Sequence, residues 1–198
     1  MKRTVIFMLA GFFVATISFI TGFTATAAAK PIRLSYANFP PAQTFPCVQM
    51  ERWKKEVEER TGGKVIIDTY PGGTLLDAMS MMDGVIAGQA DIGNLAMAYQ
   101  PGRFVLTNAT GLPLGFPDAE SASLALWELF QKYQPEEFRR VKVLTMFTSA
   151  PANLYAKRRI ATLDDLRGLE LRGAGGVAEV LRALGATPVG MPQSETPQ

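Results

Sequence analysis

Histidine is absent from the 198 residues of this chain, and cysteine occurs once, as Cys47. Without histidine there is no Ser-His-Asp or Cys-His nucleophile system and no zinc site that uses an imidazole. A single cysteine cannot close an intrachain disulfide, so the folded part depends on its apolar core. Neither observation points to an enzyme, and we expect no catalytic residues, no metal site and no cofactor.

An excess of charge of either sign is also missing. The formal net charge is +2, but Lys2 and Arg3 lie at the extreme N-terminus, and from Lys30 onward 18 basic residues face 18 acidic ones. No basic cluster interleaved with aromatic residues occurs, so we expect no nucleic-acid partner. A hydrophobic content of 47% is that of an ordinary globular protein.

The first 29 residues have the pattern of an export signal. Lys2 and Arg3 precede a mostly apolar run over residues 5–23, and small residues follow at 25–29. This order predicts a signal peptide over residues 1–29, cleaved near Ala27 to Ala29, and a periplasmic mature protein. The alternative is a retained membrane anchor, because an apolar run of this length nearly spans a bilayer.

Strands and helices are expected to alternate after this leader. Hydrophobic periodicity and glycine or proline stops predict a strand over 32–37, a helix over 45–60, a strand over 64–70, a helix over 75–86 and a strand over 90–97. Short connections between such elements imply parallel strands with right-handed crossovers, so the fold class is α/β.

The following part is less regular. Residues 99–117 contain three prolines and three glycines, and a connection of this length is usually functional or disordered. We expect a helix opened by Asp118, then strands over 141–147 and 153–156. The predicted organisation is a first α/β lobe over residues 30–145 and the beginning of a second lobe over 146–198.

The most informative stretch is LRGLELRGAGGVAEVLRALGATPVGMPQSE, residues 166–195. A short strand over 169–171 delivers Arg172 to its end, glycines then break the pattern, and a helix runs from Val177 to Leu184 before a strand begins at Thr187. A guanidinium at a strand tip, beside the glycine-rich start of a helix, suits an anion, because it offers a rigid two-pronged donor next to backbone N–H groups.

This stretch resembles the signature of the dicarboxylate-type TRAP (tripartite ATP-independent periplasmic) solute-binding proteins. The resemblance extends to VEERTGGKVIIDTYPGG (57–73), VIAGQADIG (85–93), LPLGFPDAESA (112–122) and ATLDDLRGLELR (161–172). It implies a two-lobed periplasmic binding protein-like fold with a ligand cleft between the lobes. It also implies that Arg172 binds the carboxylate of a small organic acid, which is delivered to the membrane subunits of a TRAP transporter.

The chain departs from that family in two respects. Family members are a good deal longer, so the resemblance implies that the C-terminal part, and hence part of the second lobe, is missing. Many relatives also carry a second cleft arginine near the strand aligned with 153–156, where this chain has Ala152-Asn153-Leu154. A second cationic contact to the ligand is therefore not expected from that position.

Five residues are candidates for the ligand site, and each has a purely structural alternative. Arg172 either binds the ligand or forms an ion pair with Glu170 or Glu179. Phe39 and Tyr99 follow strand ends, where crevices form, but aromatic residues there also serve as core. Asn153 and Thr148 either donate to the ligand or satisfy the backbone of their own bends.

Two other functions use the same features. Residues 173–178 fit G-x-G-x-x-A, with Glu195 about twenty residues on, as in a dinucleotide-binding enzyme, although Pro192 to Ser194 separate Glu195 from the strand. An exported lobe that senses a ligand without transporting it is the other alternative.

Overall fold

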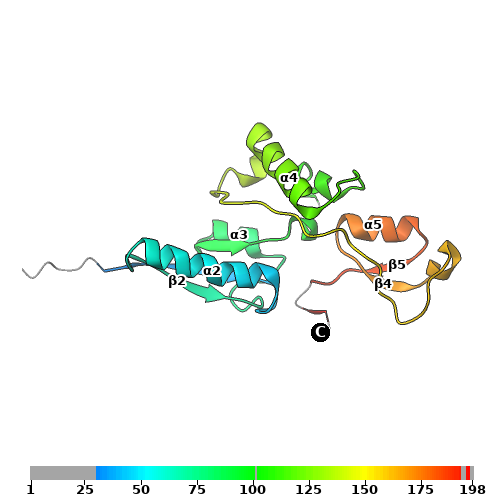
Figure 1. The fold of residues 1–198 in the computed structure, drawn as a ribbon, viewed down its shortest axis with the longest axis horizontal. Helices are drawn as coiled ribbons and strands as arrows, with labels where there is room; N and C mark the ends of the chain where they lie inside the picture. The colour runs from blue at the N-terminus through cyan, green and yellow to red at the C-terminus, as the bar shows by residue number, and fades with distance from the viewer. Residues whose placement is uncertain (1–29, 101, 193–194, 197–198) are drawn as a thin grey trace, which may run out of the picture. The chain divides into compact units, whose positions relative to one another are not determined.

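The computed structural model describes residues 30–100, 102–192 and 195–196. The predicted signal peptide over residues 1–29 lies outside the described residues. The first sheet has the strand order β2-β1-β3, with β1 Ile32–Asn38 between β2 Val65–Tyr70 and β3 Ile92–Asn94. Both pairings are parallel, which confirms the predicted α/β class (Figure 1).

The crossover between β1 and β2 is α2 Phe45–Arg60, at the predicted positions. Its second residue is Pro46, which lacks the N–H that a first helical turn leaves unpaired. Thr61 caps the C-terminus, and Gly62 and Gly63 follow with positive φ angles, where a side chain is disfavoured.

The second crossover helix, α3 Met81–Ile86, is shorter than the helix predicted over 75–86. The carboxylate of Asp77 accepts hydrogen bonds from the backbone N–H groups of Met79 and Ser80, at 2.7 and 2.8 Å. This local turn takes the donors that a longer helix would have needed, because aspartate side chains compete with the helical backbone. The predicted start at residue 75 is therefore wrong.

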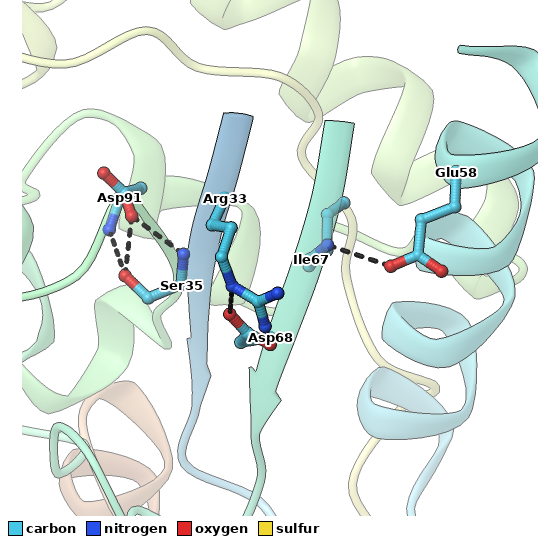
Figure 2. A network of polar contacts seen from close by, with 6 residues as sticks. All are labelled: Arg33, Ser35, Glu58, Ile67, Asp68 and Asp91. Atoms are coloured by element: carbon cyan, nitrogen blue, oxygen red, sulfur yellow. Dashed lines mark hydrogen bonds and ion pairs between the residues drawn. The ribbon is translucent and has the colours of Figure 1, made fainter. Parts of the chain in front are cut away.

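Side chains connect β2 to β1 on one side and to α2 on the other (Figure 2). Arg33 on β1 donates from Nε and Nη2 to the two carboxylate oxygens of Asp68 on β2, at 3.1 and 2.5 Å. On the other side, Glu58 of α2 accepts a hydrogen bond from the backbone N–H of Ile67, at 2.9 Å. β2 is an edge strand, and the unpaired N–H groups of an edge strand can bind a strand of another chain. The carboxylate of Glu58 prevents this at the N–H of Ile67.

Residues 97–138 form short turns and one long helix. The turns η1 Met97–Tyr99 and η2 Thr107–Gly111 precede α4 Ala119–Tyr133, and η3 Glu136–Phe138 follows it. Asp118 caps α4 as predicted, because its carboxylate accepts a hydrogen bond from Ser121 N at 2.7 Å. The buried ring of Phe138 contacts the rings of Phe104 and Phe130, and the three side chains form the core of this part.

The strands predicted over 141–147 and 153–156 are absent from the described residues. Neither segment pairs with another strand there, although Val141, Val143 and Met146 pack on the aromatic cluster. An alternating apolar pattern favours an extended backbone, but a strand exists only where a neighbour takes its hydrogen bonds.

The second sheet consists of β4 Glu170–Arg172 and β5 Thr187–Val189, which are parallel and connected through α5 Gly176–Ala183. The turn η4 Leu163–Leu166 precedes it, and a capping box formed by Thr162 and Asp165 opens that turn. The two strands and the helix agree with the sequence expectation. This sheet has a core of its own, made of Leu166, Leu171, Leu181 and Ala186. The lobe boundary at residue 145 stays a prediction.

A reciprocal contact joins β1 to the start of β3. The carboxylate of Asp91 accepts from Ser35 N at 2.8 Å and from Ser35 Oγ at 2.7 Å, and Ser35 Oγ accepts from Asp91 N at 3.0 Å (Figure 2). The backbone N–H of Ser35, followed by its hydroxyl, lowers the pKa of Asp91 below its ordinary value. Folding therefore favours the ionised carboxylate.

This contact predicts a pH-dependent loss in the variant Asp91→Ala. At neutral pH the free energy of unfolding should fall by about 1 kcal/mol, because exposed hydrogen bonds to a carboxylate are lost. A lowered folded pKa stabilises the protein above the unfolded value near 3.9, and that contribution disappears as the pH falls through the folded pKa. The difference between parent and variant should therefore narrow in acid, as measured by urea unfolding from pH 7 to pH 3.

Asp164→Ala is the matched control, since Asp164 forms only an exposed ion pair with Arg167. It should change the free energy of unfolding by less than about 0.5 kcal/mol. A pH-independent difference between the Asp91 variant and its parent would show that this carboxylate is not stabilised in the folded state.

Candidate functional site

Arg172 lies at the carboxyl end of β4, with an exposed side chain held by two hydrogen bonds. Its Nε donates to the backbone carbonyl oxygen of Met191, and its Nη2 donates to the Tyr99 hydroxyl oxygen, both at 3.1 Å. The alternative ion pairs are not formed: Glu179 pairs with Arg182, at 2.5 Å, and no carboxylate among the described residues lies within ion-pair distance of Arg172. The guanidinium is thus oriented but not neutralised.

Tyr99 connects Arg172 to the first sheet. It ends the turn η1, and its ring meets that of Phe39 edge to face, with 5.6 Å between the centroids. Phe39 directly follows β1, is 5% exposed and belongs to the core beneath that sheet. The structure thus brings three of the five predicted residues into one chain of contacts. In that chain Phe39 packs in the core and supports Tyr99.

A cavity of about 430 Å³ lies next to this chain of contacts. It is bordered by three backbone segments: the turn at Ala98 and Tyr99, the glycine-rich loop 173–175 after Arg172, and the stretch from Pro188 to Pro192. The remaining lining residues are Met79, Ala178, Arg182 and Glu195. Two of the lining residues, Tyr99 and Met191, are those that hydrogen-bond to Arg172.

Gly175 allows two of these segments to touch. Its φ is +56°, and a Cβ placed there would lie 2.7 Å from the carbonyl oxygen of Ala98 and 2.9 Å from the Ala98 side chain. Both the backbone angle and the missing space therefore require glycine. The close approach places the turn that carries Tyr99 directly against the start of α5.

Of the five predicted residues, Tyr99 lines this cavity, whereas Arg172, Phe39, Thr148 and Asn153 are not among its lining residues. Thr148 N donates to Ser123 Oγ at 2.9 Å, and its hydroxyl donates to the carbonyl oxygen of Ala119 at 3.1 Å, so Thr148 fastens the extended chain to the start of α4. Asn153 is exposed, and within the described part of the chain its side chain makes no hydrogen bond. A ligand contact by either residue stays a prediction.

Sequence reasoning missed several parts of this region. The carbonyl oxygen of Met191 has no side-chain signal, and Ala98 looks like any small residue. Arg182 and Glu195 bring charge to the cavity, and Glu195 had been weighed only as part of a dinucleotide motif. A signal for Arg182 existed, because it lies on α5, the helix that opens beside the cavity.

A buried amide pair was also missed. Asn38 and Asn94 end β1 and β3, and Asn94 Nδ2 donates to Asn38 Oδ1 at 2.9 Å. Asn38 is fully buried, and its Nδ2 has no hydrogen-bond partner among the described residues. Buried polar atoms are rarely left in this state. The sequence did offer a signal for Asn38 and Asn94. Both lie at strand ends, where the ligand crevices of α/β sheets form.

The part of the chain that the structure describes has neither a metal cluster nor a membrane-spanning helix. No three side chains of Cys, Asp or Glu gather closely enough there to hold a metal ion. No helix in that part has the length and apolar character needed to cross a bilayer.

The sequence from residue 36 to 198 matches the family model of the bacterial extracellular solute-binding proteins, family 7. The chain belongs to this family. A curated relative, the monocarboxylate 2-oxoacid-binding periplasmic protein of a Nostoc species, is 27% identical over 147 residues. That match covers 71% of this chain and 40% of the relative.

Solved TRAP solute-binding proteins share the fold. One from Desulfovibrio salexigens, an open complex with the C-terminus of a symmetry mate in its ligand-binding site, is 61% identical with a TM-score of 0.71. A marine metagenome protein specific for aromatic acid ligands, in complex with 3-hydroxybenzoate, is 31% identical with a TM-score of 0.77. Each match covers 83% of this chain and 52% of the solved chain, so this family 7 chain spans about half the length of those structures.

The contact at Gly175 predicts that Gly175→Ala destabilises this family 7 protein. A methyl group there meets the Ala98 backbone, and φ of +56° is unfavourable for alanine, so the free energy of unfolding should fall by about 1–3 kcal/mol. Chemical denaturation measures the change. Gly102→Ala is the control, because a Cβ at Gly102 meets no atom within 4 Å and its φ is not positive. Equal stability of the two variants would rule out the close approach.

Proposed function

We propose that the protein is a periplasmic solute-binding protein of a TRAP transporter, which captures a small organic acid by its carboxylate and delivers it to membrane subunits. The observation that carries this proposal is the state of Arg172. Its guanidinium is oriented by Tyr99 and Met191, two residues that line the cavity, yet no carboxylate of the described residues pairs with it. Family membership supports the same function.

A carboxylate is the anion that this arrangement suits best. The guanidinium is planar, stays protonated at physiological pH and presents parallel N–H groups that match the two oxygens of a carboxylate. Part of its hydration is already replaced by the Tyr99 hydroxyl and the Met191 carbonyl. An anion arriving from the cavity therefore meets a donor whose orientation is fixed, which lowers the entropic cost of binding.

The charges around the cavity favour an acid with one negative charge. Glu179 already balances Arg182, and Glu195 adds a negative charge to the lining. Around the cavity, Arg172 is the one cation of the described residues without a carboxylate partner, so a second carboxylate on the ligand would meet repulsion from Glu195. The name of the Nostoc relative, a monocarboxylate 2-oxoacid-binding protein, supports this choice.

The walls favour an apolar body on that acid. Met79, Ala98, Pro188 and Met191 contribute apolar surface, and Tyr99 contributes a ring. The marine metagenome relative binds an aromatic acid, 3-hydroxybenzoate. We therefore place small aromatic and aliphatic monocarboxylates first among the ligands to test.

Binding by closure of two lobes is the mechanism that we infer. A ligand that contacts both lobes only in the closed state shifts the population toward that state, and the closed form then docks on the membrane subunits. Export by a signal peptide over residues 1–29 would deliver the protein to the periplasm.

A sensing role without transport is the alternative that would use the same cavity. Unlike the transport role, it requires no membrane subunits for uptake of the ligand.

The dinucleotide-binding alternative receives less support from the geometry. Residues 173–178 do connect β4 to α5, as that motif requires. However, the close approach that Gly175 permits is occupied by the carbonyl of Ala98, where a cofactor pyrophosphate would need the space.

The proposal predicts that substitution of Arg172 abolishes acid binding. Calorimetry with 3-hydroxybenzoate, benzoate and pyruvate should show that Arg172→Ala loses at least about 30-fold in affinity, since an unpaired anion costs about 2–5 kcal/mol. Arg172→Lys should also lose most of the affinity, because an ammonium lacks the planar fork.

Arg167→Ala serves as the control, because Arg167 forms only an exposed pair with Asp164. It should bind the same acids as the parent protein does. Unchanged affinity in both Arg172 variants would remove Arg172 from the site, and a parent protein that binds none of a broad panel of carboxylates would refute the proposed function.

A further inference from the structure

The two hydrogen bonds of Arg172 use one particular edge of its guanidinium. Nε–H and one N–H of Nη2 lie side by side along the edge of the planar group. Met191 O accepts from the first and Tyr99 Oη accepts from the second, each at 3.1 Å. Among the described residues no atom accepts from Nη1, so the end of the group formed by Nη1 and the other N–H of Nη2 remains for a ligand.

We propose that Tyr99 is a positioning residue whose hydroxyl, together with the Met191 carbonyl, orients Arg172 so that a carboxylate binds end-on, across Nη1 and Nη2. This inference rests on the proposed function for the identity of the ligand. It assigns Tyr99 a hydrogen-bonding role toward Arg172, beyond the shape of its ring.

The surroundings of Tyr99 suit this role. Its ring packs edge to face on Phe39, a buried core residue, so the hydroxyl projects from a rigid support. The preceding residue, Ala98, is in close contact with Gly175, three residues after Arg172. The donor and the acceptor are thus fixed relative to each other by the backbone as well as by their own bond.

Orientation of this kind affects affinity because an arginine side chain otherwise samples many rotamers. Fixing a long side chain before the ligand arrives removes an entropic cost from the binding step. Two acceptors on one edge also prevent the guanidinium from turning that edge toward the cavity. The ligand then meets a single arrangement of donors.

The test uses the conservative variant Tyr99→Phe, which keeps the ring and its contact with Phe39. Affinity for 3-hydroxybenzoate and pyruvate should fall about tenfold, since a hydrogen bond to a charged group is lost. Tyr155→Phe is the matched control, because Tyr155 is 85% exposed and does not line the cavity. That variant should bind as the parent does.

A second readout needs no ligand. In ¹⁵N-labelled protein the Nε–H signal of Arg172, assigned by its loss in Arg172→Lys, should exchange slowly with water. In Tyr99→Phe it should exchange several times faster, because the edge is held at one point only. This measurement separates the two proposals, since it is informative even if the parent protein binds no carboxylate.

The outcomes that overturn the inference are specific. Equal affinity and equal exchange in Tyr99→Phe would show that the hydroxyl positions nothing. Lower affinity with unchanged exchange would assign Tyr99 to direct ligand contact instead. If Tyr99→Phe does not fold, the parent protein still provides a test. An Arg172 Nε–H signal that exchanges with water as fast as that of exposed Arg159 would refute the positioning.

Discussion

A guanidinium stays charged at every physiological pH, and an exposed one is paired with an acid, solvated by water or available to an anion from outside. Among the described residues neither Glu170 nor Glu179 forms an ion pair with Arg172, and Glu179 binds Arg182. Neutral oxygens from Tyr99 and Met191 hold Arg172 instead. They fix its direction and leave its charge uncompensated, and the binding function that we propose depends on that difference.

This arrangement requires the backbones of two segments that are distant in the sequence to lie in contact. Tyr99 and Arg172 are separated by 73 positions, and the turn before Tyr99 touches Gly175, where a Cβ has no room. Arg172 lies at the end of β4, and its acceptor Tyr99 lies in the turn η1. Gly175 has no side chain, so the two segments can approach each other closely. Ligand affinity and local stability are therefore expected to be linked at this contact.

Local patterns predicted β1, α2, β2 and the β4-α5-β5 unit, because periodicity and glycine stops are encoded within each segment. They failed at residues 141–147, where alternation specifies an extended backbone but not a partner strand, and at α3, where the Asp77 side chain takes the donors of the first turn. Arg172 was proposed as a ligand residue from its place at a strand tip and from the family resemblance of its flanks. Its acceptors were not, because a backbone carbonyl has no sequence signature and a contact over 73 positions follows only from the tertiary fold.

A crystal structure of the protein with 3-hydroxybenzoate or another bound monocarboxylate tests the central claim most directly. We expect the two carboxylate oxygens at about 2.7–2.9 Å from Nη1 and Nη2 of Arg172, with the hydrogen bond to Tyr99 retained. A bound acid whose carboxylate is held by other residues, with Arg172 still lacking an anionic partner, would contradict the account.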